Sequence, residues 1–181
     1  MADAARRIAL ADVSTSHPWV NVLPAAPASR LSLRAPADSL SALSKVLELP
    51  LPTRPKNSAR QGERAALWLG PDEWLVMDRE SADLPAVFAQ AEAFHSAVDI
   101  SHRNVGIIVS GRGAQATLEA GCPQDISQGT FPVGACSRTL LGKIEIVLWR
   151  TGPDEFRVEC WRSFSDYAFA FLTEAARDAV V

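Results

Sequence analysis

The sequence predicts an α+β fold of two similar halves, each a small antiparallel sheet backed by helices. The segment Gly-Pro-Asp-Glu-Trp-Leu-Val at residues 70–76 recurs in related form 82 positions later, at residues 152–158. Around both copies, short apolar strands and amphipathic helical segments follow the order strand–helix–strand–strand–helix. We therefore expect residues 30–181 to form one domain, with half repeats at about 30–95 and 98–178 related by a pseudo-twofold axis.

The elements of the first half can be placed from their apolar spacing. A short alternating strand around Leu31 and Leu33 leads to a helix that starts near Asp38 and ends before Pro50. An apolar strand at residues 67–69 precedes the Gly-Pro-Asp-Glu turn, in which proline presets the backbone for a tight hairpin. The following helix is predicted to bury Leu84, Val87, Phe88, Ala91 and Phe94.

The second half repeats these elements. Residues 105–109 predict a strand, a helix follows from about Gly113, and residues 147–149 form the strand before the second turn. Ser163 and Asp166 predict a capping pair for the final helix. The apolar face expected of that helix comprises Phe164, Tyr167, Ala168, Phe171, Leu172 and Ala175.

Residues 1–29 are predicted to form an extended arm outside the core. Pro18, Pro24 and Pro27 fall in a segment with little periodicity, and proline removes backbone donors and fixes φ. Trp19 lies within this arm. It either packs back onto its own domain or anchors a partner protein.

Composition argues against several classes of function. The 181 residues carry a net charge of −3 and a pI of about 5.6, so no positive field recruits nucleic acid. The longest apolar run, residues 167–172, is far shorter than the ~20 residues of a membrane span. Three cysteines without a C-x-x-C pair indicate a reduced, cytoplasmic protein, and no histidine or cysteine spacing predicts a metal site.

Two motifs allow more than one interpretation. The segment Gly-Arg-Gly-Ala-Gln-Ala at residues 111–116 fits a dinucleotide fingerprint between a strand and a helix, but no acidic residue ends a strand about 20 positions later. The alternative is a tight strand-to-helix turn that Gly113 permits. The turn acids Asp72, Glu73, Asp154 and Glu155 could act as paired carboxylates, but turn tips are solvated, and we interpret these acids as turn-forming.

Arginine dominates the basic residues, at 15 of the 18. Arg138, Arg150, Arg157 and Arg162 lie in or beside predicted strands of the second half. Arginine and tryptophan are enriched at interface hot spots, so the candidates for a protein–protein surface are Trp19, Arg138, Arg150 and Arg162. A solvated sheet face is the alternative interpretation.

Several motifs resemble known families. Val-Asp-Ile-Ser-His at residues 98–102, followed by Val-Ser-Gly at 109–111, resembles the signature of the glycine-cleavage T-protein superfamily, whose members bind tetrahydrofolate. A narrower resemblance covers the chain from about residue 65. Residues 67–75, 119–123, 131–139 and 161–167 together resemble the gamma subunit of heterotetrameric sarcosine oxidase.

This resemblance implies a fold similar to the T-protein folate-binding domain and a subunit without catalytic residues. In that family, alpha, beta, gamma and delta subunits oxidatively demethylate sarcosine to glycine, hydrogen peroxide and 5,10-methylenetetrahydrofolate. FAD, FMN, NAD, zinc and tetrahydrofolate belong to the other subunits. We therefore expect no cofactor and no metal on this chain, which would dock mainly on the alpha subunit.

One departure from the T-protein pattern supports a non-catalytic chain. Where T-proteins carry two adjacent acids, this sequence has Ile144 and Glu145, so one candidate group for orienting the folate amine is absent. The alternative is a free-standing tetrahydrofolate-binding, aminomethyltransferase-like protein that uses Asp99, His102 and Glu145. An adaptor for another amine-oxidising flavoprotein is a third hypothesis.

Overall fold

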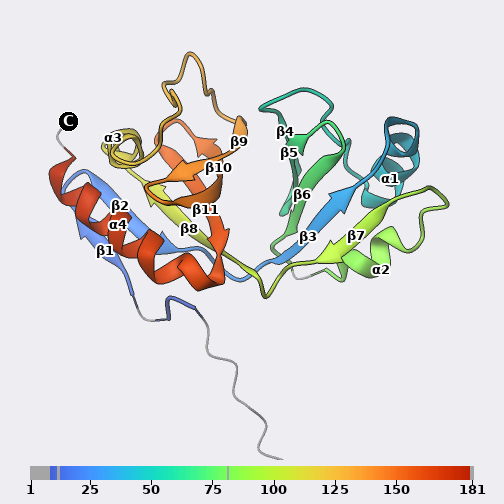
Figure 1. Cartoon of the computed structure of the whole chain (residues 1–181), viewed down its shortest axis with the longest axis horizontal. Helices are drawn as coiled ribbons and strands as arrows, with labels where there is room; N and C mark the ends of the chain where they lie inside the picture. Colours follow the sequence, from blue (N-terminus) through green and yellow to red (C-terminus); the bar gives the residue numbers. More distant parts are fainter. Residues whose placement is uncertain (1–8, 12, 81, 180–181) are drawn as a thin grey trace, which may run out of the picture.

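A computed structural model describes residues 9–11, 13–80 and 82–179, which form two antiparallel sheets with helices on their outer faces (Figure 1). The six-stranded sheet contains β1 (Thr15–His17), β2 (Val20–Pro24), β8 (Asn104–Ser110), β9 (Cys136–Leu141), β10 (Ile144–Gly152) and β11 (Glu155–Trp161), in the order β1-β2-β8-β11-β10-β9. The five-stranded sheet contains β3 (Ser29–Arg34), β4 (Ser58–Gln61), β5 (Arg64–Gly70), β6 (Glu73–Asp78) and β7 (Ser96–Asp99), in the order β4-β5-β6-β3-β7.

Two helices cover each sheet. The 3₁₀ turn η1 (Ala37–Ser39) leads into α1 (Leu40–Leu47), which packs with α2 (Leu84–Phe88) on the five-stranded sheet. Helix α3 (Ala114–Glu119), the 3₁₀ turn η2 (Arg162–Phe164) and α4 (Ser165–Asp178) lie on the six-stranded sheet. Within the described residues, no helix is long and apolar enough to cross a membrane.

The two Gly-Pro-Asp-Glu segments form the same hairpin. Strands β5 and β6 are joined through residues 71–72, and β10 and β11 through residues 153–154. Each hairpin has a register shift directly before its turn, between Trp68 and Gly70 in the first and between Arg150 and Gly152 in the second. The predicted repeat is therefore confirmed in the backbone, including the position of this irregularity.

Residues 15–24 correct the prediction of an arm outside the core. Strands β1 and β2 pair with each other, and β2 pairs with β8, so that Val22 lies opposite Val109. Both Val20 and Val22 are buried in the core under α3 and α4. The prolines misled the prediction because Pro18 lies in the β1–β2 turn and Pro24 ends its strand, positions where a missing donor costs no pairing in the interior of the sheet.

Strands β2 and β7 are exchanged between the halves. Strand β2 leads into β3 of the five-stranded sheet, yet it pairs with β8 of the six-stranded sheet. Strand β7 leads into β8, yet it pairs with β3. The connections at residues 25–28 and 100–103 pass between the two lobes at the lower centre of Figure 1. Strand β2, which precedes the first half, thus completes the six-stranded sheet, and β7, which precedes the second half, completes the five-stranded sheet.

The helices α2 and α4 differ from their predictions in extent and orientation. Helix α2 ends at Phe88, because the chain must turn into the edge strand β7, and Phe94 is 84% exposed. Phe164 of η2 and Tyr167 of α4 are exposed, while Phe169 of α4 is buried. The 3₁₀ turn before α4 has three residues per turn and rotates the helix face relative to an uninterrupted α-helix.

The inner faces of the two sheets meet through a small apolar layer. Strands β5 and β6 of one sheet face β9 and β10 of the other. The buried residues of this layer are Ala65, Leu67, Leu75, Met77, Ile100, Cys136, Val147 and Trp149. The remaining inner face carries charged side chains, which form the candidate site.

Candidate functional site

A buried ionic triad joins the two sheets. Glu159 of β11 accepts hydrogen bonds from Arg30 Nε at 2.6 Å, across the sheet interface, and from Arg157 Nε at 2.7 Å. The three residues are 2%, 5% and 4% exposed, respectively. Burial alone would raise the pKa of Glu159, but Arg157 and Arg30 outweigh it and lower that pKa, so the group is a carboxylate at neutral pH. The triad carries a net positive charge, and Arg157 Nη2 has no acceptor.

The triad depends on a glycine in the neighbouring strand. Gly106 of β8 lies opposite Glu159 in the β8–β11 ladder. A β-carbon at this position would lie 2.7 Å from Arg157 Nη2 and 2.7 Å from Glu159 Oε1, closer than real side chains approach. Only glycine leaves room there for the guanidinium and the carboxylate.

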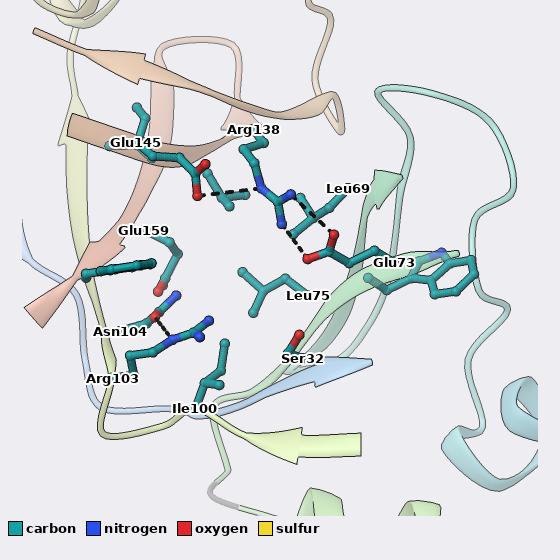
Figure 2. Close-up of a pocket in the computed structure, with 14 residues that line it drawn as sticks. Ser32, Leu69, Glu73, Leu75, Ile100, Arg103, Asn104, Arg138, Glu145 and Glu159 are labelled. Carbon is teal, nitrogen blue, oxygen red and sulfur yellow. Dashed lines mark hydrogen bonds and ion pairs between the residues drawn. The ribbon is translucent and has the colours of Figure 1, made fainter. Parts of the chain in front are cut away.

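Next to the triad, a second ionic cluster lines a cavity between the sheets (Figure 2). Glu73, at the tip of the β5–β6 hairpin, forms an ion pair with Arg138 of β9 in the opposite sheet. Arg34 also pairs with Glu73 at 3.0 Å, and Arg138 Nε lies 3.7 Å from Glu145. Burial would raise the pKa of Glu73, but Arg138 and Arg34 together lower it.

Glu73 corrects the interpretation of the turn acids as solvated. Its side chain is only 14% exposed, and the carboxylate bridges the two sheets instead of facing water. In contrast, Glu155, the equivalent residue of the second turn, is exposed and accepts a hydrogen bond from Thr151 Oγ1 at 2.6 Å. The turn residues therefore share a local structure but differ in their long-range contacts.

A pseudo-equivalent cavity lies against the second hairpin. It is lined by Arg60, Glu63 and Glu155, among others. Arg60 in the β4–β5 ladder is equivalent in position to Arg138 in the β9–β10 ladder. Arg60 pairs with Glu63 at 3.8 Å. Among the described residues, the ion pair between a turn acid and an arginine of the opposite sheet is therefore observed at the first hairpin and not at the second.

Both cavities are too small for a cofactor. Each has a volume of about 40 Å³, whereas ligand sites typically enclose ~300–1,000 Å³. Such a space accommodates a few water molecules. The Glu73–Arg138 ion pair lines the first cavity, and its small volume does not fit tetrahydrofolate.

The three residues considered for folate binding do not form one site. Glu145 lines the cavity of Figure 2, whereas His102 is exposed and lines a different groove. Asp99 Oδ1 accepts a hydrogen bond from Ser101 N at 2.8 Å, and Ser101 Oγ accepts one from Arg30 N. The Asp-x-Ser segment therefore caps the chain where β7 ends.

The four candidates for a protein–protein surface have different environments. Arg150 is 3% exposed and donates to the carbonyls of the loop before β9 and of the second hairpin turn, so its assignment to a surface is wrong. Arg138 is engaged within the chain by Glu73. Trp19 is 40% exposed, with the Arg112 guanidinium 4.3 Å from its ring centroid. Arg162 is exposed beside α4.

The Gly-x-Gly segment before α3 packs against the β1–β2 turn. Gly111 has a φ of +108°, and a β-carbon on it would clash with the Trp19 carbonyl oxygen. Gly113 N donates to the same oxygen at 3.0 Å. These contacts explain both glycines and support the interpretation as a tight turn.

The cysteines show no sign of reactivity. Burial raises the pKa of Cys136 and of Cys160 to about 12, so both are thiols at neutral pH. Among the described residues, no group of three or more histidine, cysteine, aspartate or glutamate side chains could hold a metal ion.

Sequence reasoning missed Arg30 and Glu159, and it considered Arg157 only as one of the arginines in or beside the strands of the second half, not as part of a buried triad. The alternation along residues 155–161 places Arg157 and Glu159 on one face of a strand whose other face is apolar. A polar face of this kind is typical of a solvated strand. The available signal was an acid and an arginine two positions apart within an otherwise apolar strand.

Comparison with known proteins shows consistent similarities. The model of the sarcosine oxidase gamma subunit family matches residues 34–178. The chain is 34% identical over 113 residues to sarcosine oxidase subunit gamma of Corynebacterium sp. (strain P-1), covering 61% of this chain and 56% of that protein. It therefore spans just over half of that relative. It is 30% identical over 153 residues to sarcosine oxidase subunit gamma of Arthrobacter sp., covering 82% of this chain and 75% of that protein.

Two solved structures share the fold. A chain of the heterotetrameric sarcosine oxidase from Corynebacterium sp. U-96, solved in complex with pyrrole 2-carboxylate, has a TM-score of 0.83 at 27% identity, over 90% of this chain and 86% of that chain. The glycine cleavage system aminomethyltransferase T from Bartonella henselae has a TM-score of 0.63 at 13% identity, over 88% of this chain and 46% of that one. The second similarity concerns the fold alone and confirms the predicted likeness to the T-protein domain.

Proposed function

The chain belongs to the sarcosine oxidase gamma subunit family, and from this membership we propose that it is the gamma subunit of a heterotetrameric sarcosine oxidase. It docks on the alpha subunit and stabilises it, with beta and delta subunits in the same cytoplasmic complex. The complex oxidatively demethylates sarcosine to glycine, hydrogen peroxide and 5,10-methylenetetrahydrofolate. The other subunits hold FAD, FMN, NAD, zinc and tetrahydrofolate.

The observation that carries the non-catalytic role is the ion pair between Glu73 and Arg138. This pair lines the same small cavity as Glu145, and Glu145 stands where T-proteins carry one of their two adjacent acids. The remaining volume of about 40 Å³ leaves no room for a pterin ring. Arg138 Nε also lies 3.7 Å from Glu145, so this carboxylate has a cationic partner within the chain.

The test is to produce the alpha, beta and delta subunits with and without this chain. When the chain is omitted, we expect the alpha, beta and delta subunits no longer to elute as one complex in size-exclusion chromatography. Sarcosine-dependent peroxide formation should be lost as well. A Glu145→Gln chain should restore both, because Glu145 has no catalytic role in this proposal. Full assembly and activity without the chain would contradict the proposal, and so would restored assembly without activity in the variant.

Free-standing tetrahydrofolate binding is the second candidate function, and the position of Glu145 at a cavity favours it. Isothermal titration of the purified chain with tetrahydrofolate separates the two functions. We expect no saturable heat, because the cavity of about 40 Å³ is too small for tetrahydrofolate. Saturable binding that Glu145→Gln abolishes would support the alternative.

A further inference from the structure

A third and larger groove lies where the two exchanged connections meet. Residues 24–28 form one wall, and Leu10 and Val105 extend it, so the wall is mainly apolar. The groove has a volume of about 400 Å³, within the ~300–1,000 Å³ of typical binding sites. It is ten times the volume of either cavity between the sheets.

The polar lining of this groove favours an anion. Arg30 and Arg162 contribute guanidinium groups, and His102, Ser101 and Asn104 add hydrogen-bonding groups. Among the described residues that line it, none is aspartate or glutamate. Cationic groups on an apolar wall suit a carboxylate flanked by apolar groups.

The buried triad adds positive charge beneath the groove. Arg30 belongs to both, and Glu159 is the single carboxylate that neutralises the guanidinium groups of Arg30 and Arg157. Arg30 donates from Nε and Nη2 to Glu159 and from Nη1 to the Ala28 carbonyl, which uses three of its five N–H groups. An arriving carboxylate would therefore find unused donors and an uncompensated positive charge.

The surface around the groove extends beyond the size of a small molecule. Arg162 lies between this groove and a second one of about 260 Å³ that also includes Val13 and, as its acidic residue, Asp166. Beside it, Trp161 and Phe164 stack with ring centroids 6.1 Å apart and remain 46% and 39% exposed. The Arg103 guanidinium lies 5.6 Å from the Trp161 ring centroid. Aromatic and arginine side chains together are typical of interface cores.

We propose that this groove and the adjoining Trp161–Phe164 pair form the surface that receives an acidic segment of the large partner subunit. The inference rests on the proposed function and specifies the chemistry of its docking. A partner carboxylate binds over Arg30 and Arg162, and apolar partner side chains cover the wall at residues 24–28. Charge complementarity selects the partner, since the chain as a whole is acidic whereas the described lining of this groove carries no acidic side chain.

The test uses the four-subunit complex and two variants that place an acid in the groove. Ala26→Glu adds a carboxylate at an exposed wall residue, and Arg162→Glu reverses a charge. Arg54→Glu, at an exposed residue outside the groove, changes the net charge as Arg162→Glu does and serves as its control. We expect the apparent dissociation constant, from size exclusion over a dilution series, to rise about tenfold or more for the first two variants and less than about twofold for the control. Thermal unfolding of each isolated chain verifies that the variants fold.

The outcomes separate the two proposals. If the unmodified chain does not assemble with the other subunits, the proposed function fails. If it assembles and both groove variants assemble equally well, the docking surface is overturned while the function stands. Saturable binding of benzoate to the isolated chain, together with unimpaired assembly of both variants, would assign the groove to a free organic acid and also overturn the proposal.

Discussion

Replacing Glu159 by glutamine tests how strongly the triad holds the two sheets together. The variant retains the size of the side chain but leaves the guanidinium groups of Arg30 and Arg157 buried without their counter-charge. Removing one partner of a buried ion pair costs ~3–5 kcal/mol. One carboxylate here serves two arginines, so we expect a loss in the upper half of that range. For a chain of this size, the loss corresponds to a decrease in Tm of roughly 8–20 °C.

The assay is urea and thermal unfolding of the purified chain, followed by circular dichroism. Glu145→Gln is the matched control, because Glu145 is 57% exposed and lies 3.7 Å from Arg138. The exposed pair should contribute less than ~1 kcal/mol. A loss of less than about 1 kcal/mol for Glu159→Gln would refute the reasoning, since it would mean that water or a rearrangement solvates both arginines.

Acid should reduce the difference between the wild type and Glu159→Gln. Burial raises the pKa of Glu159, but the two arginines outweigh burial and lower it from its ordinary value of 4.5. The carboxylate therefore contributes its stabilisation fully above the unfolded-state pKa and loses it as the pH falls through the lower, folded-state pKa. A difference in unfolding free energy that stays constant on acidification to below that range would contradict this assignment.

The first half of the chain provides a template for an apolar replacement. In the two hairpins, Leu75 and Met77 occupy the positions of Arg157 and Glu159. A variant with Arg157→Leu, Glu159→Met and Arg30→Met should recover most of the stability that Glu159→Gln loses, because apolar groups need no counter-charge. If it is less stable than Glu159→Gln, the cost lies in packing and not in unpaired charge.

Three further predictions concern other buried groups. Glu73→Gln should lower the free energy of unfolding in urea by ~1–2 kcal/mol. Burial raises the pKa of Glu73, but Arg138 and Arg34 outweigh burial and lower it, so the loss should shrink as acid protonates the wild-type carboxylate. An unchanged urea midpoint would contradict the ion pair between the sheets. Gly106→Ala should lower the Tm by more than ~5 °C, because its β-carbon would lie 2.7 Å from the triad; a small change would show that the triad can move. Cys136 and Cys160, with pKa values raised to about 12, should react with a thiol reagent at pH 8 only in denaturant, as read from absorbance.

Local chemistry made much of the fold predictable. The Gly-Pro-Asp-Glu turns carry their structure within four residues, so both hairpins and the repeat were evident before any contact was known. Helix α1 was also predictable, because Leu43 and Leu47 are spaced for one buried face. The resemblance to the gamma subunit family, carried by motifs after residue 65, agrees with the family model.

The exchanged strands and the charged interface were not predictable in this way. Pairing of β2 with β8 joins residues such as Val22 and Val109, and nothing local in either strand identifies its partner. Arg157 and Glu159 occupy the polar face of an amphipathic strand, and that pattern does not reveal a second sheet. For the same reason, Glu73 was assigned to turn chemistry, although its carboxylate reaches Arg138 65 positions away.

The exchange of β2 and β7 makes the chain resemble a domain-swapped dimer whose two protomers have been fused. Cutting the backbone between α2 and β7 would leave a first fragment that lacks β7 and a second fragment that lacks β1 and β2. Neither fragment should fold alone, whereas mixing them should restore the whole. In the intact chain, the lobes cannot swing apart as independent rigid bodies without extracting a strand from a sheet, so unfolding should proceed as one cooperative transition.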